Sequence, residues 1–189
     1  MLALSMRMAL SMRMSPDVTW RPVRWAAPPA RALAVVVRQS GQVADDAATG
    51  MHDDLHRFVV AQDEDGSYHR ALGELRRGRK SGHWMWFVFP QIAGLGHSQL
   101  SRHFALAGLA QAQAYLAHPV LGPRLDQCVT AVLGHPEQRA EEMLGGIDAV
   151  KLRSSMTLFE RAEPSRTAFG AILDTFFDGV RDPETLCRL

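Results

Sequence analysis

Apolar side chains recur every three or four residues along most of the chain after residue 50, which is the spacing of one buried face of an α-helix. The clearest stripe consists of Leu121, Leu125, Cys128, Val129 and Val132. Gly, Pro and capping residues interrupt the pattern at intervals and indicate where helices end. The expected helices lie around residues 53–62, 68–78, 98–116, 118–132, 136–144, 147–161 and 164–177, followed by a short turn that begins at Asp182-Pro183. This pattern predicts one compact, mainly α domain of seven or eight helices over residues 51–189, with at most one or two short strands.

Residues 83–90, which read His-Trp-Met-Trp-Phe-Val-Phe-Pro, depart from this pattern. Both alternating faces of the run are apolar, so it is too hydrophobic for a surface strand. The chain contains no second strand-like run to pair with it. We therefore expect an extended or irregular segment inside the core that ends at Pro90.

The first fifty residues differ in composition from the rest. The six residues Ala-Leu-Ser-Met-Arg-Met occur twice, at 3–8 and 9–14, and the segment holds six Arg and three acidic residues. Such an Arg-rich, acid-poor segment superficially suits an organelle transit peptide. A disordered leader, or upstream DNA translated from a misassigned start, is the preferred interpretation, with Met51 as the functional beginning.

Charge and cysteine content narrow the class of protein. The formal net charge is +1, divided into +3 for residues 1–50 and −2 for residues 51–189, where 15 basic and 17 acidic residues occur. A domain at −2 is a poor candidate for general nucleic-acid binding. Two Cys without metal-type spacing favour a reduced, cytoplasmic setting, and no apolar run is long enough to span a membrane. We expect a monomer that uses no cofactor or metal.

Residues 76–86 are the strongest candidate for a binding site. They combine four basic side chains, one His, two Gly and two Trp. Arg and Lys bind phosphate oxygens, Gly allows close approach of a ligand, and Trp stacks on flat rings. An ordinary helix C-terminus followed by core tryptophans explains the charges alone somewhat better and the whole arrangement equally well. The candidate ligand-binding residues in this segment are Arg79, Lys80, His83, Trp84 and Trp86.

Five further polar residues are candidates for the same site. On a helix, Lys151, Ser154 and Ser155 lie together at the border of the apolar face, where they face either a polar pocket or simple packing neighbours. Gln62 lies on an apolar face and Gln91 follows Pro90; both amides bind either a ligand or backbone groups of the fold. The sequence contains no His-Glu-x-x-His metal motif and no Gly-x-Ser-x-Gly nucleophile elbow, so catalytic residues stay unassigned.

Several uncommon stretches occur in the order typical of one family. They are Gly78-Arg79-Lys80, His83-Trp84-Met85-Trp86-Phe87, Phe89-Pro90-Gln91-Ile92, Gly94-Leu95-Gly96, His118-Pro119-Val120-Leu121-Gly122 and Ser154-Ser155-Met156-Thr157-Leu158-Phe159. From Leu55 to Leu189 the chain thereby resembles domain-of-unknown-function family 1810. The resemblance implies a small, mainly helical fold whose activity is unknown.

The resemblance extends more remotely to the NAD- and ADP-ribose-associated superfamily, whose members act on N-glycosidic bonds of ribosyl compounds. It implies a phosphorylated or nucleotide-like ligand, held by the basic and Trp residues, and possible N-glycosidase-like hydrolysis. Such an enzyme needs a carboxylate near the ribose, for which Asp148, Asp174 and Asp178 are guesses. The alternative is a non-catalytic protein-interaction module that presents the Trp-Met-Trp-Phe run as an anchor. The small-molecule hypothesis requires that the basic turn, residues 76–80, and the serine pair, Ser154 and Ser155, converge on a shared hollow. The interaction-module hypothesis requires that the Trp-Met-Trp-Phe run is partly exposed.

Overall fold

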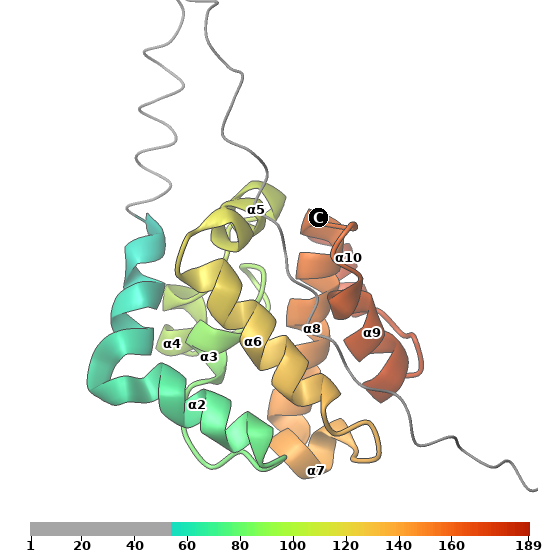
Figure 1. The fold of residues 1–189 in the computed structure, drawn as a ribbon. Coiled ribbons are helices and arrows are strands. Elements are labelled where there is room, and N and C mark those ends of the chain that lie inside the picture. Colours follow the sequence, from blue (N-terminus) through green and yellow to red (C-terminus); the bar gives the residue numbers. More distant parts are fainter. Residues whose placement is uncertain (1–53) are drawn as a thin grey trace, which may run out of the picture. The chain divides into compact units, whose positions relative to one another are not determined.

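The computed structural model describes residues 54–189 of the chain, and Figure 1 shows them as a compact set of packed helices. The expected leader and the first residue of the helix expected over 53–62 lie outside the described residues. The elements are a helix at 54–63, the 3-10 turn η1 (Glu64–Gly66), α2 (Ser67–Arg76), α3 (Met85–Val88), α4 (Gln99–His103), α5 (Leu109–Ala117), α6 (Leu121–Leu133), α7 (Ala140–Leu144), α8 (Gly146–Ala162), α9 (Thr167–Phe176) and α10 (Pro183–Leu186). The prediction of a compact, mainly α-helical domain is confirmed for this part of the chain.

Helix α8 is the central element of the fold. It packs against α5, α7, α9 and α10, and α6 crosses in front of it in Figure 1. Its residues from Ser154 to Phe159 are all buried, so the helix contacts neighbours on every side in this stretch. A helix that is surrounded in this way carries polar residues into the interior, and these must find partners there.

Two helix caps agree with the sequence pattern. The Ser98 side chain accepts a hydrogen bond from the Ser101 backbone N–H and caps α4. The Asp182 carboxylate accepts from the Thr185 backbone N–H, with Pro183 at the first position of α10. Local chemistry therefore determines where these two short helices begin.

The prediction of one long helix over 98–116 is wrong, because the chain leaves the helical path between α4 and α5. Leu106 there donates its backbone N–H to Gln91 O at 2.9 Å, and Ala93 donates to Leu106 O at 2.8 Å. Among the described residues this isolated bridge between Ile92 and Leu106 is the single β-type pairing. It buries Leu106 completely, whereas Leu100 on α4 stays about half exposed. A tertiary contact thus overrides the local helical preference.

The prediction of an extended aromatic segment is also wrong, because residues 85–88 form the short helix α3. Met85, Val88 and Phe89 are buried, and they stand at positions i, i+3 and i+4 of one helical turn. The run is apolar on all sides, so it fits a buried helical turn as well as a buried strand. With a split helix and this extra turn, the described residues contain more helices than the pattern indicates.

Two predicted helix starts move by a few residues. The helix expected from His118-Pro119 begins at Leu121, because His118 Nδ1 accepts from the backbone N–H groups of Val120 and Leu121 and caps it from outside. The helix expected over 136–144 covers only Ala140–Leu144 as α7.

Candidate functional site

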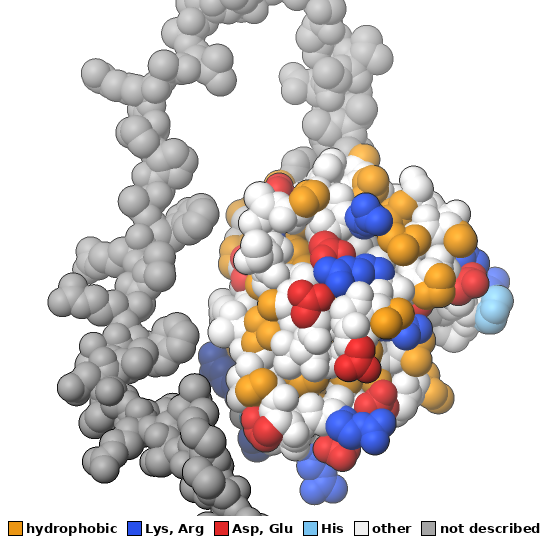
Figure 2. Space-filling view, turned by 90° about the vertical axis from the view of Figure 1, so that its right-hand side faces the viewer, with side chains coloured by type: hydrophobic (Ala, Val, Ile, Leu, Met, Phe, Trp, Pro, Cys, Tyr) orange, Lys and Arg blue, Asp and Glu red, His pale blue; other side chains and the backbone are white. Residues whose placement is uncertain are grey.

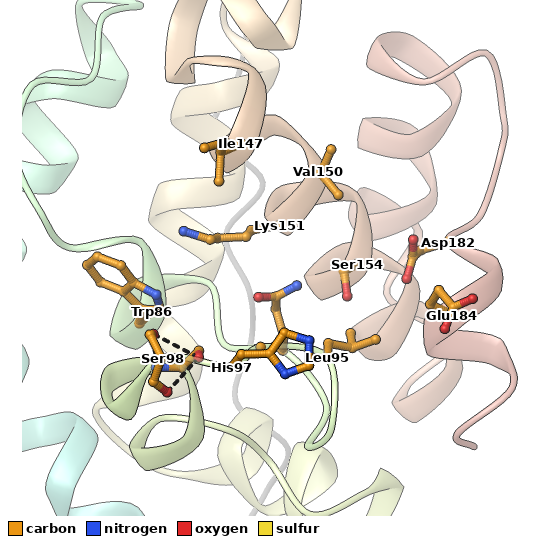
Figure 3. A pocket seen from close by; sticks show the side chains of 13 residues that line it. Trp86, Leu95, His97, Ser98, Ile147, Val150, Lys151, Ser154, Asp182 and Glu184 are labelled. Atoms are coloured by element: carbon orange, nitrogen blue, oxygen red, sulfur yellow. Dashed lines mark hydrogen bonds between the residues drawn. The ribbon is translucent and has the colours of Figure 1, made fainter.

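A pocket of about 630 Å³ lies beside the first half of α8, and Figure 3 shows it from close by. One wall comes from α3, α4 and the segment between them, and the other comes from α8 and the start of α10. The first wall includes Trp86, Gln91, Leu95, His97, Ser98 and Ser101. The second wall includes Ile147, Val150, Lys151, Ser154, Asp182 and Glu184. This volume falls within the range of small-molecule sites, which is roughly 300–1,000 Å³.

Lys151 and Trp86 form one end of the pocket. The Lys151 ammonium lies 4.6 Å from the centre of the Trp86 ring, and Figure 3 shows the side chain directed toward the indole. Lys151 Nζ also donates to Asp148 Oδ1 at 2.7 Å, one turn back on α8. The ammonium is therefore held in place from two sides.

Lys80 from the basic turn binds the same carboxylate. Its Nζ lies 2.8 Å from Asp148 Oδ2 and 5.2 Å from the centre of the Trp84 ring. Burial acts to raise the pKa of Asp148, but the hydrogen bonds and positive charges of Lys151 and Lys80 outweigh it and lower the pKa below its usual value. Two lysines and one carboxylate leave a net charge of +1 in this cluster. The basic turn and α8 thus meet through one aspartate.

Lysine is rare in this chain, and both lysines belong to this cluster. Lys80 and Lys151 are the only lysines in the sequence, among 21 basic residues of which the others are Arg. Both bind Asp148, and each lies over a Trp ring. An ammonium is a compact point charge, so each lysine can bind one oxygen of Asp148. The scarcity of Lys is therefore a sequence signal that points to this cluster.

Hydroxyl and carboxylate groups form the other end of the pocket. The buried Ser154 Oγ lies 2.7 Å from Thr185 Oγ1, and Thr185 Oγ1 donates to Asp182 Oδ2 at 2.7 Å. Glu184, which is exposed, lies beside them in Figure 3. Asp182 and Glu184 are functional candidates that the sequence interpretation missed. Their pattern, a helix cap before a Pro, indicated only a helix start.

The rest of the basic segment is organised around Glu74 of α2, which the sequence interpretation also missed. The Glu74 carboxylate accepts four hydrogen bonds, from Ser81 N, Ser81 Oγ, Gly82 N and Trp84 Nε1, at 2.7–2.9 Å. Burial acts to raise its pKa, but these hydrogen bonds lower the pKa from 4.5 to about 2. Glu74 therefore holds the turn and Trp84 in place without help from a basic side chain.

Gln62 has a structural role in the core. Its Nε2 donates to Phe87 O at 2.8 Å and to Tyr115 Oη at 3.1 Å, while Arg124 donates to its Oε1 at 3.3 Å. Burial raises the pKa of Tyr115, although the Gln62 hydrogen bond acts in the opposite direction. The amide thus ties α3 to α5 and is fully occupied by protein groups.

The ten candidate residues divide into three sets. Those that line the pocket are Trp86, Gln91, Lys151 and Ser154. Those that lie outside it and are bound or packed within the protein are Gln62, Lys80, Trp84 and Ser155. Those that lie outside it and are exposed are Arg79 and His83. His83 and Trp84 line a smaller hollow of about 280 Å³ together with Glu74. From residues 76–86 the pocket therefore includes Trp86 but none of the basic side chains, and from the serine pair it includes Ser154 but not Ser155.

Two details concern residues that the pocket does not include. The buried Ser155 Oγ has no hydrogen-bond partner among the described residues. Trp84 and Met85 are buried, so only Trp86 and Phe87 of the aromatic run are partly accessible. The buried half of the run, Trp84 and Met85, cannot serve as an anchor for a partner, which leaves Trp86 and Phe87 for the interaction-module hypothesis.

Ion pairs between acidic and basic side chains occur on the α9 side of the surface. Arg181 binds Glu160 and Asp174, and Arg166 binds Asp126. Figure 2 shows acidic and basic side chains next to one another on the face on the α9 side. No group of three or more His, Cys, Asp or Glu residues that could hold a metal ion occurs in residues 54–189. Over the same range, no helix combines the length and the apolar character that a membrane crossing requires.

The fold and the pocket define a class, namely a small helical domain with a mixed polar and apolar pocket beside its central helix. The chain belongs to the family described as "Protein of unknown function (DUF1810)", which matches residues 52–189. It is similar to a conserved hypothetical protein, Rv1873 from Mycobacterium tuberculosis, whose crystal structure is known. The two share 47% sequence identity at a TM-score of 0.70, over 72% of this chain and 96% of that one. No curated protein matches the chain.

Proposed function

We propose that the pocket beside α8 binds a phosphorylated, nucleotide-like small molecule. The observation that carries this proposal is the division of the pocket into two chemically different ends. Lys151 and Trp86 form a cationic and aromatic end, while Ser154, Asp182 and Glu184 form an end rich in hydrogen-bond acceptors. A nucleotide has both complements, since its phosphate is anionic and its sugar carries hydroxyl groups.

The cationic end favours a phosphate because its positive charge is not fully neutralised. Asp148 supplies one negative charge to two ammonium groups, at 2.7 and 2.8 Å. The lysine side chains are mostly buried, with 10% of Lys80 and 19% of Lys151 exposed. An anion beside Lys151 would therefore meet an uncompensated charge in a setting of low dielectric, where the attraction is stronger than in water.

The aromatic and apolar residues of the pocket favour a flat ring. Trp86 is half-buried beside Lys151, and Ile147 and Val150 are large apolar side chains that stay 79% and 54% exposed at the opposite wall. Covering them with a ligand would remove apolar surface from water. Stacking of a base on an aromatic ring contributes about 1–3 kcal/mol.

Hydrolysis of an N-glycosidic bond is the reaction that this arrangement would suit. Asp182 is fixed by two hydrogen bonds from Thr185 and lines the pocket, so a ribosyl group at that end would have a carboxylate close to its anomeric carbon. In the reaction water adds its hydroxyl to the anomeric carbon and a proton goes to the leaving nitrogen. Asp182 is a better candidate than Asp148, Asp174 or Asp178, because none of these three lines the pocket. Asp148 binds Lys80 and Lys151, and Asp174 binds Arg181 at a different surface hollow.

The two lysines allow a direct binding experiment. Reductive methylation with ¹³C-formaldehyde labels Lys80, Lys151 and the α-amino group and preserves their charge. Addition of ADP-ribose, NAD, ribose 5-phosphate or AMP should shift the Lys151 methyl signal more than the Lys80 signal. In thermal-shift assays, a ligand at a hundred times its Kd adds about 2.7 kcal/mol of stability.

Matched variants separate the pocket from the ion cluster. Lys151→Met should abolish the ligand-induced stabilisation, whereas Lys80→Met should weaken it less, since Lys80 does not line the pocket. Hydrolysis is followed by chromatographic detection of the released base. Absence of binding by all four compounds at millimolar concentration refutes the proposed function.

A further inference from the structure

The direction of the hydrogen bonds at the α10 end of the pocket decides which groups a ligand can present there. Thr185 Oγ1 lies 2.7 Å from Asp182 Oδ2 and 2.7 Å from Ser154 Oγ. An ionised carboxylate only accepts hydrogen bonds, so Thr185 donates its single hydroxyl hydrogen to Asp182. Ser154 must then donate its own hydrogen to Thr185. The Ser154 oxygen is left with lone pairs and has no hydrogen for a ligand.

The side chains next to Ser154 are also hydrogen-bond acceptors. Glu184 and Asp182 line this end and also act as acceptors. The geometry in Figure 3 places them on the side of the pocket opposite Trp86. A ligand at this end must therefore donate hydrogen bonds, which hydroxyl and ammonium groups can do.

The charges favour a neutral donor over a cation. Arg153 Nη2 lies 3.5 Å from Asp182 Oδ1, and Arg188 Nη1 lies 2.9 Å from Glu184 Oε2. Each carboxylate already faces a guanidinium, so an ammonium group would find little uncompensated negative charge. Hydroxyl groups need no such charge, and buried acceptors bind them through hydrogen bonds alone.

We infer that the α10 end of the pocket selects the vicinal hydroxyls of a sugar and that Ser154 is a specificity-determining residue. This inference rests on the proposed function and adds an orientation to it. The sugar lies against Ser154 and Asp182, and the phosphate lies toward Lys151. Because Ser154 is held as an acceptor by Thr185, it distinguishes ligands with a hydroxyl from those without one.

AMP and its 2′,3′-dideoxy analogue test this inference, because they carry the same base and phosphate and differ by two hydroxyl groups. Isothermal titration of the wild-type chain should show the dideoxy analogue binding at least about tenfold more weakly, since it leaves buried acceptors unpaired. Ser154→Ala should reduce this difference to about threefold or less by weakening AMP. Ser165→Ala, at an exposed serine outside the pocket, is the matched control and should preserve the difference.

The outcomes separate this inference from the proposed function. Equal binding of AMP and the dideoxy analogue overturns the inference and leaves phosphate binding intact. Tighter binding of the diamine putrescine than of AMP, lost in Ser154→Ala, overturns the charge argument. If ribose 5-phosphate binds but AMP and its dideoxy analogue do not, the inferred selection of the nucleotide sugar is overturned. If no phosphate compound binds, the proposed function is refuted as well.

Discussion

Glu74 offers the sharpest test of the physical reasoning, through the single substitution Glu74→Gln. Glutamine has nearly the same shape as glutamate and retains one oxygen for the three N–H donors from Ser81, Gly82 and Trp84, which converge on Oε2. The amide of the variant faces Ser81 Oγ, which accepts as readily as it donates. The substitution therefore removes the negative charge and changes little else.

The magnitude follows from the pKa of the carboxyl group. Its pKa falls from 4.5 in the unfolded chain to about 2 in the fold, and each pKa unit corresponds to about 1.4 kcal/mol. The ionised form thus contributes about 3 kcal/mol at pH 7. A lowered pKa gives stability that is present above pH 4.5 and is lost as the pH falls toward 2. At pH 3 the same relation leaves about 1.4 kcal/mol.

Urea denaturation of both proteins at pH 7, 5, 4 and 3 measures this contribution. We expect Glu74→Gln to lower the free energy of unfolding by about 3 kcal/mol at pH 7 and by about half as much at pH 3, so the two curves approach one another in acid. Glu137→Gln, at an exposed position, is the control and should leave the free energy unchanged within about 0.5 kcal/mol. A constant difference between wild type and Glu74→Gln across this pH range would refute the assignment of the effect to the Glu74 charge.

Three further predictions concern α8. Asp148→Asn leaves two mostly buried ammonium groups without a charge partner, so the free energy of unfolding should fall by about 2 kcal/mol at pH 7. The loss should be smaller in acid, because the pKa of Asp148 is lowered in the fold. A pH-independent loss in urea titrations would contradict this. Ser155→Ala removes a buried hydroxyl without a described partner, so its effect on stability should be neutral or favourable. Ser154→Ala removes a hydrogen-bond donor to Thr185 and should lower the stability by about 1 kcal/mol. Thermal unfolding that ranks the two variants in the opposite order would be inconsistent with these contacts. Leu152→Ala, at a fully buried position, should lower the free energy of unfolding by about 2–5 kcal/mol, because it leaves a cavity. Val150→Ala, on the exposed rim of the pocket, should lower it by less than about 0.5 kcal/mol. Similar losses for the two variants in chemical denaturation would contradict the burial of Leu152.

Part of the candidate site could be predicted from the sequence, because short motifs contain several of the residues that line it. The pairing of Lys151 and Ser154 on one helix face follows from helical spacing, and both line the pocket. Trp86 and Gln91 also stand in the predicted segments and line it. Arg79 shows the limit of this approach, since it is exposed and outside the pocket, whereas its sequence neighbour Lys80 is mostly buried and binds Asp148. Spacing along the chain does not tell which of several neighbouring side chains faces a cavity formed by distant elements.

The amino-acid sequence by itself determined the helical class and the short caps at Ser98 and Asp182, since these depend on interactions within a few positions of one another. Of the residues that line the pocket, it indicated Trp86, Gln91, Lys151 and Ser154 but not Asp182 or Glu184. The tertiary structure alone decided that Lys80 and Lys151 share Asp148, that Glu74 receives the basic turn, and that Ser154 meets Thr185 and Asp182 from α10. It also broke the helix expected over 98–116 at Leu106, because a buried contact with Gln91 outweighed local propensity. Long-range contacts close loops whose geometry depends on the packing of the whole core, and no local pattern encodes them.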